Sequence, residues 1–216
     1  MWETLMDSPT LRILRVCCGP FESLCYLIED KPDRSSFLID CGCPADEVIG
    51  LLELNGLRLE AVLLTHTHFD HVLEVNAVTR RAGSRAIAHP ADVEMLPVYW
   101  REELGSEPEV IPMVEEGLSL SLGSLSLLAL HTPGHTPGSV CYYSREVGVI
   151  FTGDTLFRGA IGTLRYSGSP DSQKQMRRSL KRLYSLPEDT LVLPGHGDST
   201  TIGEERETIR RALRYP

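Results

Sequence analysis

The stretch that decides the fold is EAVLLTHTHFDH, residues 60–71. Its first half is an apolar run that predicts a buried strand, and its second half carries four candidate ligands directly at the end of that strand. Alternate side chains of extended backbone share a face, so His66, His68 and Asp70 are expected to point the same way. His71 is expected to begin the next helix. Imidazole and carboxylate suit zinc, iron or manganese, so the stretch favours a metal site over a histidine-rich surface loop.

Three more predicted strands end on candidate ligands with a glycine beside them. They are HTPGH at 131–135, TGD at 152–154 and LPGHG at 193–197. Glycine allows a sharp turn and a close backbone approach, so several strand ends can converge on one point. One such element is weak evidence, whereas the combination predicts a metal centre built from several strand ends.

The rest of the chain alternates between predicted strands and predicted helices. Strands are expected at 11–16, 24–29, 36–40, 84–89, 118–132, 139–144, 148–154 and 191–195, with turns at Gly123-Ser124 and Arg145-Glu146. Helices are expected at 45–56, 71–82, 91–104, 171–186 and 203–214, with Asp171 placed to cap the fourth. The order is sheet, helices, sheet, helices. It predicts an α/β fold of two packed sheets with helices on both outer faces, an αββα sandwich, in a single domain over 1–216.

Composition and charge narrow the class of protein. Hydrophobic residues make up 42% and charged residues 24%, which is ordinary globular usage. The net charge of -9 disfavours nucleic acid and anionic membranes as partners. The chain has no apolar run long enough for a membrane span, and its start does not resemble a signal peptide. We therefore expect a cytoplasmic protein with a small-molecule substrate.

The cysteines favour free thiols over a structural metal site. The six cysteines show no repeated C-x-x-C pair, so buried free thiols are the expected reading. Scarce lysine, asparagine and glutamine are typical of a heat-adapted source, in which an intracellular disulfide is less unusual. The alternative is therefore a disulfide among Cys17, Cys18, Cys25, Cys41 and Cys43.

Five segments, in their order along the chain, resemble the metallo-β-lactamase superfamily and in particular its short glyoxalase II-like branch. They are SFLID, which contains Asp40, then THTHFDH, HTPGHTPGS, FTGDTLF and LPGHGDSTTIGEE. The resemblance implies a four-layer αββα fold and two divalent metal ions, zinc with iron or manganese as alternatives. It implies that the first ion is held by His66, His68 and His135, the second by Asp70, His71 and His196, and that Asp154 bridges them.

The resemblance also implies hydrolysis of an anionic thioester such as S-2-hydroxyacylglutathione. The two ions would lower the pKa of a shared water, which then attacks the carbonyl, and Asp70 would orient this water, help move its proton or act as a ligand alone. Asp40 would support the metal loop by hydrogen bonding, and His131 is expected beside the ligands and not among them. His89, before Pro90, is expected to be structural.

The substrate pocket departs from the family pattern. The usual lysine-containing stretch is replaced by 163–168, where Arg165 and Tyr166 are candidate substitutes beside Arg158. The chain stops soon after His196, so part of the usual thiol-binding surface is expected to be missing.

Other functions of the same superfamily stay open. A persulfide dioxygenase would hold one iron on residues matching His66, His135 and Asp154, and a lactonase or β-lactamase would use the same site with different pocket walls. A nuclease is disfavoured because no large inserted domain or basic surface is evident. A non-catalytic binding protein is disfavoured because every matched ligand is present.

Overall fold

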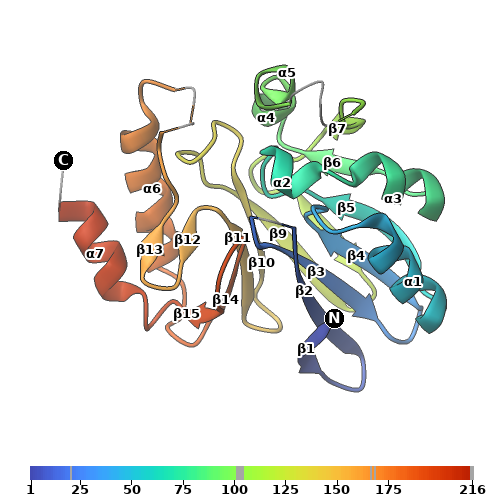
Figure 1. The fold of residues 1–216 in the computed structure, drawn as a ribbon. Helices are drawn as coiled ribbons and strands as arrows, with labels where there is room; N and C mark the ends of the chain where they lie inside the picture. The colour runs from blue at the N-terminus through green and yellow to red at the C-terminus, as the bar shows by residue number, and fades with distance from the viewer. Residues whose placement is uncertain (20, 101–104, 166, 168, 215–216) are drawn as a thin grey trace.

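Two sheets packed face to face form the centre of the molecule, and helices cover both outer faces (Figure 1). The computed structural model describes residues 1–19, 21–100, 105–165, 167 and 169–214. The predicted αββα sandwich is confirmed. Within these residues, no helix is long and apolar enough to cross a membrane.

The 7-stranded sheet follows the order of the chain from β1 to β7. Its strands are Glu3–Asp7 (β1), Leu11–Cys18 (β2), Ser23–Asp30 (β3), Ser35–Ile39 (β4), Arg58–Leu63 (β5), Ala86–Ala88 (β6) and Val110–Pro112 (β7). Strands β1 to β4 are antiparallel, whereas β4 to β7 are parallel. Parallel strands need long crossovers, which here contain helices. The carboxyl ends of β4, β5 and β6 therefore lie at one edge of the sheet.

The 6-stranded sheet has the order β15-β14-β11-β10-β9-β8. Its strands are Ser119–Leu122 (β8), Leu125–His131 (β9), Val140–Ser144 (β10), Val149–Gly153 (β11), Leu191–Pro194 (β14) and Thr200–Thr201 (β15). Antiparallel pairs join β8 to β9 and β10 to β11, so both predicted hairpins are present. Because β11 and β14 are parallel, the residues that follow them meet at one edge. A separate two-stranded sheet pairs Leu156–Phe157 (β12) with Ala160–Ile161 (β13).

The helices lie in two groups. Ala45–Asn55 (α1), Phe69–Val72 (α2), Val75–Ala82 (α3), Pro90–Val93 (α4) and Leu96–Tyr99 (α5) belong with the first sheet, and Ser172–Tyr184 (α6) and Arg206–Arg214 (α7) with the second (Figure 1). The buried apolar side chains form one cluster between the sheets and one under each helical layer. The central cluster includes Tyr26 and Phe151, whose ring centroids are 5.3 Å apart. This rigid double sheet fixes the strand ends that carry the candidate ligands.

Several predicted elements differ in the structure. The helix predicted over 71–82 is two helices, α2 and α3, because the backbone N–H of Glu74 bonds to the carbonyl of Cys41. Asp70 therefore lies in α2 and not on an extended strand, so the expected alternation ends at His68. Asp171 occupies the N-cap of α6 without a side-chain capping bond.

Other differences concern short elements. Strands β1 and β7, at the ends of the first sheet, were not expected from the sequence. The helix predicted over 91–104 is broken into α4 and α5, with Pro97 in the first turn of α5, and its residues 101–104 lie outside the described part.

The expectation of free thiols is wrong for one pair. Cys18 and Cys43 form a disulfide across 25 positions, which joins the end of β2 to the segment that precedes α1. Cys25, Cys41 and Cys141 are free and buried, as expected, and Cys17 is free and exposed. The spacing of the cysteines does not reveal the pair, because their proximity depends on the fold around them.

Candidate metal centre

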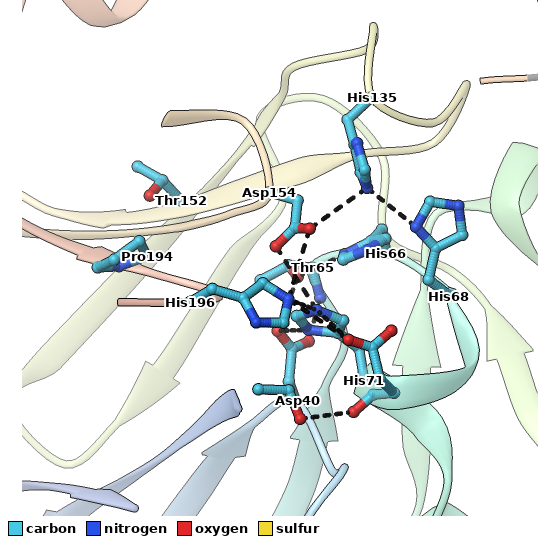
Figure 2. Close-up of polar contacts among 12 residues, drawn as sticks. Asp40, Thr65, His66, His68, His71, His135, Thr152, Asp154, Pro194 and His196 are labelled. Atoms are coloured by element: carbon cyan, nitrogen blue, oxygen red, sulfur yellow. Dashed lines mark hydrogen bonds and ion pairs between the residues drawn. The ribbon is translucent and has the colours of Figure 1, made fainter. Parts of the chain in front are cut away.

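The strand ends of both sheets meet at one point between them, where the candidate ligands lie (Figure 2). His66 and His68 follow β5, Asp70 and His71 belong to α2, and the other three come from the ends of β9, β11 and β14. The three candidate ligand groups are His66/His68/His135, His66/His71/Asp154 and Asp70/His71/His196, each with ligand atoms within 4.8 Å of one another.

The first cluster consists of His66, His68 and His135. The Nε2 atom of His135 lies 2.9 Å from Nδ1 of His68, and the His66 ring is 4.8 Å from the His68 ring. Nδ1 of His135 lies 2.8 Å from the carbonyl of Thr163, so this nitrogen carries the hydrogen and Nε2 keeps its lone pair. Each of the three rings thus has a nitrogen that lies close to a nitrogen of another ring in the cluster.

The second cluster consists of Asp70, His71 and His196. Nε2 of His71 lies 3.2 Å from Nε2 of His196, and Oδ2 of Asp70 lies 3.3 Å from the same His196 atom. Nδ1 of His71 lies 2.9 Å from Oδ2 of Asp40. An ionised carboxylate only accepts, so Nδ1 of His71 carries a hydrogen, and its Nε2, which faces the cluster, offers a lone pair once the ring is neutral.

Asp154 lies between the two clusters. Its Oδ2 is 3.5 Å from Nε2 of His135 in the first cluster and 3.6 Å from Nε2 of His196 in the second. Its Oδ1 is 3.5 Å from Nε2 of His71. One carboxylate is therefore within reach of both clusters, as a bridging ligand must be.

The unsatisfied atoms of the site fit a bound cation. His66 Nε2 and Asp154 Oδ1, from one candidate ligand group, are buried and have no hydrogen-bond partner. Buried polar atoms are ordinarily paired, and both of these atoms can accept, so they fit the coordination of a cation. Gly195 leaves the room that this approach needs, because a Cβ there would lie 2.2 Å from Oδ1 of Asp154. Nitrogen and carboxylate donors in this number suit zinc, iron or manganese.

Burial keeps the first cluster neutral. It lowers the pKa of His66 well below its usual value, with further lowering by the other histidines, and lowers the pKa of His68 to about 3. Burial likewise lowers the pKa of His135, although Asp154 opposes this. Neutral imidazoles are the form that binds metals, so this cluster needs no deprotonation at neutral pH.

Carboxylates give the second cluster the opposite character. Burial lowers the pKa of His71, but Asp40 and Asp154 outweigh it and raise that pKa to about 10. The pKa of His196 is raised in spite of burial, because Asp70 accepts its hydrogen bond. This cluster attracts positive charge, and a metal ion there competes with protons.

Asp40 supports the loop that carries most ligands. This residue is 2% exposed and adopts a left-handed φ of 56° directly after β4. Its Oδ1 accepts from the backbone N–H of Thr65 at 2.8 Å, and its Oδ2 accepts from the Thr65 hydroxyl at 2.8 Å. That hydroxyl lies 3.1 Å from Nδ1 of His66. Asp40 thus orients His71 directly and His66 through Thr65.

Two buried tyrosines, one from each sheet, extend across the core and bond to the ends of strands in the opposite sheet. Tyr26, on β3 of the first sheet, donates to the carbonyl of Pro194 at 2.7 Å, and Tyr142, on β10 of the second sheet, donates to the carbonyl of Leu64 at 2.9 Å. Each of these carbonyls lies two residues before a candidate histidine ligand. The hydroxyls therefore tie each ligand loop to the opposite sheet.

The remaining predicted residues lie outside the two clusters. His131 stacks on His89 with ring centroids 4.0 Å apart, and its Nε2 lies 2.9 Å from the carbonyl of Pro137. Arg158 is exposed and pairs with Asp198 at 3.4 Å. Arg165 is exposed as well, and Tyr166 lies outside the described residues.

Sequence reasoning missed Asp92, which is 0% exposed and contacts both loops that carry the first cluster. Burial raises its pKa to about 6, although hydrogen bonds from Thr136, Gly138 and Thr67 oppose the shift. An aspartate in the first turn of a short helix after a proline is ordinary in sequence, so no local signal marks this one.

Known proteins resemble this chain over most of its length. The model of the metallo-beta-lactamase superfamily matches residues 18–196. The hydroxyacylglutathione hydrolase GloC of Haemophilus influenzae is 33% identical over 196 residues, which cover 87% of this chain and 92% of GloC. The crystal structure of TTHA1623 in a di-iron-bound form is 36% identical, with a TM-score of 0.76 and coverage of 90% and 97%. That of the BLEG-1 B3 metallo-beta-lactamase is 32% identical, with a TM-score of 0.78 and coverage of 90% and 96%.

Proposed function

The chain belongs to the metallo-β-lactamase superfamily, and from this premise we propose that it is a two-metal hydrolase of glyoxalase II type, acting on small anionic thioesters. The observation that carries the proposal is the position of Asp154 between two clusters of buried, converging ligand atoms. The similarity to GloC, a protein named as a hydroxyacylglutathione hydrolase, supports the substrate class.

Each cluster has a defined role in this proposal. His66, His68 and His135 hold the first ion, Asp70, His71 and His196 hold the second, and Asp154 contacts both. The ions are zinc, with iron as the first alternative because TTHA1623 has a di-iron form, and manganese as the next. When bound, two such ions lower the pKa of a water toward neutrality and stabilise negative charge on a carbonyl oxygen.

The side chains around the site support water as the nucleophile. Burial raises the pKa of the Cys25 thiol to about 12 and that of Cys141 to about 11, so neither is a thiolate at neutral pH. Asp70 stays ionised, because burial is outweighed by His196 and His71, which lower its pKa to about 2. It can therefore accept a hydrogen bond from a water beside the second cluster and orient it.

The β12–β13 hairpin lies beside the second cluster. The ring of Phe157 lies 6.2 Å from the ring of His196, and Arg158 follows it in the chain. Arg158 is 61% exposed at its side chain, so its guanidinium is free to exchange Asp198 for a carboxylate of the substrate. We propose Arg158, Arg165 and Tyr166 as substrate contacts, which predicts that Arg158→Ala raises KM and leaves kcat nearly unchanged.

The test combines metal content with two activities. Purified protein is assayed for bound metal, for hydrolysis of S-D-lactoylglutathione and for oxygen uptake with glutathione persulfide. Two metals per chain with thioester cleavage, lost in His66→Ala and retained in the buried control Asp30→Asn, support the proposal. One iron with oxygen uptake and no thioester cleavage contradicts it and identifies the dioxygenase.

A second candidate function is β-lactam hydrolysis. The observation that favours it is the similarity to the BLEG-1 structure, which is titled as a B3 metallo-beta-lactamase. The same clusters would serve, since a lactam carbonyl also needs an activated water and a stabilised oxyanion. If kcat/KM for a chromogenic cephalosporin exceeds that for lactoylglutathione, the proposed substrate class changes from thioester to β-lactam.

A further inference from the structure

Asp92 is a fully buried carboxylate that the proposed reaction does not use. It lies in α4, which follows the parallel strand β6, and 0% of it is exposed. A buried carboxylate without hydrogen bonds would cost several kcal/mol, so its partners explain why it is kept. Apart from local backbone bonds to His89 and residues 94–95, all of its described hydrogen bonds go to two loops that are distant in sequence.

The two carboxylate oxygens divide the partners between them. Oδ2 accepts from the backbone N–H of Thr67 at 3.0 Å and from the hydroxyl of Thr136 at 2.9 Å. Oδ1 accepts from the backbone N–H of Gly138 at 2.6 Å. In addition, the carbonyl of Asp92 accepts from the Thr67 hydroxyl at 2.9 Å. One residue thereby bonds to two loops that are 25 and 46 positions away.

These contacts are interleaved with the first cluster. Thr67 stands between His66 and His68, and Thr136 directly follows His135. A shift of either loop would separate the His68 and His135 nitrogens, which now lie 2.9 Å apart. The described bonds of Asp92 do not reach the segments that carry Asp154 or His196.

We propose that Asp92 is a positioning residue of the metal centre, which fixes the distance between the Thr67 and Thr136–Gly138 backbones and so preorganises His66, His68 and His135 for the first ion. The inference rests on the proposed metal centre but not on the proposed substrate. Such outer contacts ordinarily fix ligand geometry, and here they act through the loop backbone.

Only a carboxylate satisfies this set of partners. Two of the three donors are backbone N–H groups, which cannot reverse their polarity. An asparagine has one acceptor oxygen, so its NH₂ group would face either Thr67 or Gly138 donor to donor. Gly138 permits the close approach, because a Cβ there would lie 2.7 Å from Oδ1 of Asp92.

A second contact holds α4 against the same loop. His89 caps α4, because its Nδ1 accepts from the N–H of Ala91 at 3.2 Å, and its ring stacks on His131 at 4.0 Å. His131 in turn lies 2.9 Å from the carbonyl of Pro137. The His89–His131 stack thus fixes the position of α4, and of Asp92 within it, relative to the loop that carries His135.

The experiment measures each metal site separately by Zn²⁺ competition with a chromophoric chelator. Full-length His196→Ala retains the first cluster, and full-length His135→Ala retains the second. Asp92→Asn is introduced into both and should weaken Zn²⁺ binding about tenfold or more in His196→Ala. In His135→Ala, binding should stay within the error of the measurement.

Asp30→Asn is the matched control, because Asp30 is 2% exposed and accepts the backbone N–H of Asp33 at 3.1 Å, away from the ligand loops. It should leave both affinities unchanged. Equal losses in both backgrounds, or no loss in His196→Ala, would overturn the inference. No Zn²⁺ binding by the His196→Ala parent would overturn the metal centre on which it rests, whatever the substrate.

Thr136→Val keeps the test valid if Asp92→Asn does not fold. It removes the hydroxyl that donates to Asp92 at 2.9 Å and also contacts Ser139, and it preserves the shape of the side chain. A smaller loss of Zn²⁺ affinity confined to the His196→Ala background supports the inference. An unchanged affinity there, or an equal change in both backgrounds, overturns it.

Discussion

The two clusters of the candidate metal centre are supported by two buried aspartates, one in direct contact with a candidate ligand and the other through the backbone of two loops. Asp40 bonds directly to a ligand, since its Oδ2 lies 2.9 Å from Nδ1 of His71 in the second cluster. Asp92 touches no ligand and holds the first cluster through the backbone of Thr67 and Gly138. The supporting carboxylate of the second cluster therefore contacts one of its histidines, whereas that of the first cluster acts through the loop backbone.

The pKa values follow this difference. Carboxylates raise the pKa of His71 to about 10, whereas burial outweighs the influence of Asp70 and lowers that of His68 to about 3. The first cluster is thus a preformed set of neutral nitrogen donors. The carboxylates of the second cluster attract a cation, but its histidines must release a proton when a metal ion binds. We expect the first ion to bind with little pH dependence near neutrality and the second to bind more weakly as the pH falls.

The largest expected effect comes from removing the residue that the clusters share. Asp154→Ala should lower kcat/KM for the thioester by about 10³-fold or more, because it disrupts both clusters at once. Metal content, measured by elemental analysis, should fall below two ions per chain. Asp30→Asn serves as the control, and an Asp154→Ala protein with two ions and full activity would remove Asp154 from the centre.

The disulfide holds the segment that follows Asp40, next to the second cluster. Cys43 follows Gly42, where a Cβ would lie 1.8 Å from the carbonyl oxygen of Asp70, so the bridged segment packs directly on α2. Closing a loop of 25 positions stabilises a fold by roughly 3 kcal/mol. Urea unfolding of Cys18→Ser should show a loss of this size, and Cys17→Ser should show none. Equal curves for the two variants would mean that the bridge does not form in solution.

Replacing Asp40 tests whether the second cluster depends on a direct contact. In Asp40→Asn, an NH₂ group beside His71 would donate to Nδ1 and move the hydrogen to Nε2, the atom that faces the cluster. Zn²⁺ affinity should fall by about 10- to 100-fold in the His135→Ala background. A loss confined to the His196→Ala background would instead assign Asp40 to the first cluster.

The sequence shows one of these aspartates and hides the other for a physical reason. Asp40 ends a predicted strand in the SFLID segment that carries the family resemblance, and the candidate ligands sit in short motifs whose spacing is local, so the same residues are brought together in the structure. Asp92 meets Thr67 and Gly138 only after the parallel strands β5 and β6 have paired and the second sheet has packed on the first. The Cys18–Cys43 bridge and the break between α2 and α3 are also tertiary, since the Glu74 N–H bonds to Cys41.

The smallest expected effect separates the two supports most cleanly. Thr65→Val and Thr136→Val each remove one buried hydroxyl. The Thr65 hydroxyl donates to Asp40 at 2.8 Å, and the Thr136 hydroxyl donates to Asp92 at 2.9 Å. Each should reduce the free energy of unfolding by about 1 kcal/mol, since each leaves a buried acceptor with one bond fewer. The Thr65 hydroxyl also lies 3.1 Å from Nδ1 of His66, whereas that of Thr136 otherwise contacts Ser139.

The two valine variants should therefore lose Zn²⁺ affinity in different patterns. Thr65→Val should weaken both single-site backgrounds, because it loosens Asp40 on one side and His66 on the other. Thr136→Val should weaken only His196→Ala, the background that retains the first cluster. If Thr65→Val acted on one background alone, the two clusters would be supported independently, and Thr65 would not link them as the hydrogen bonds indicate.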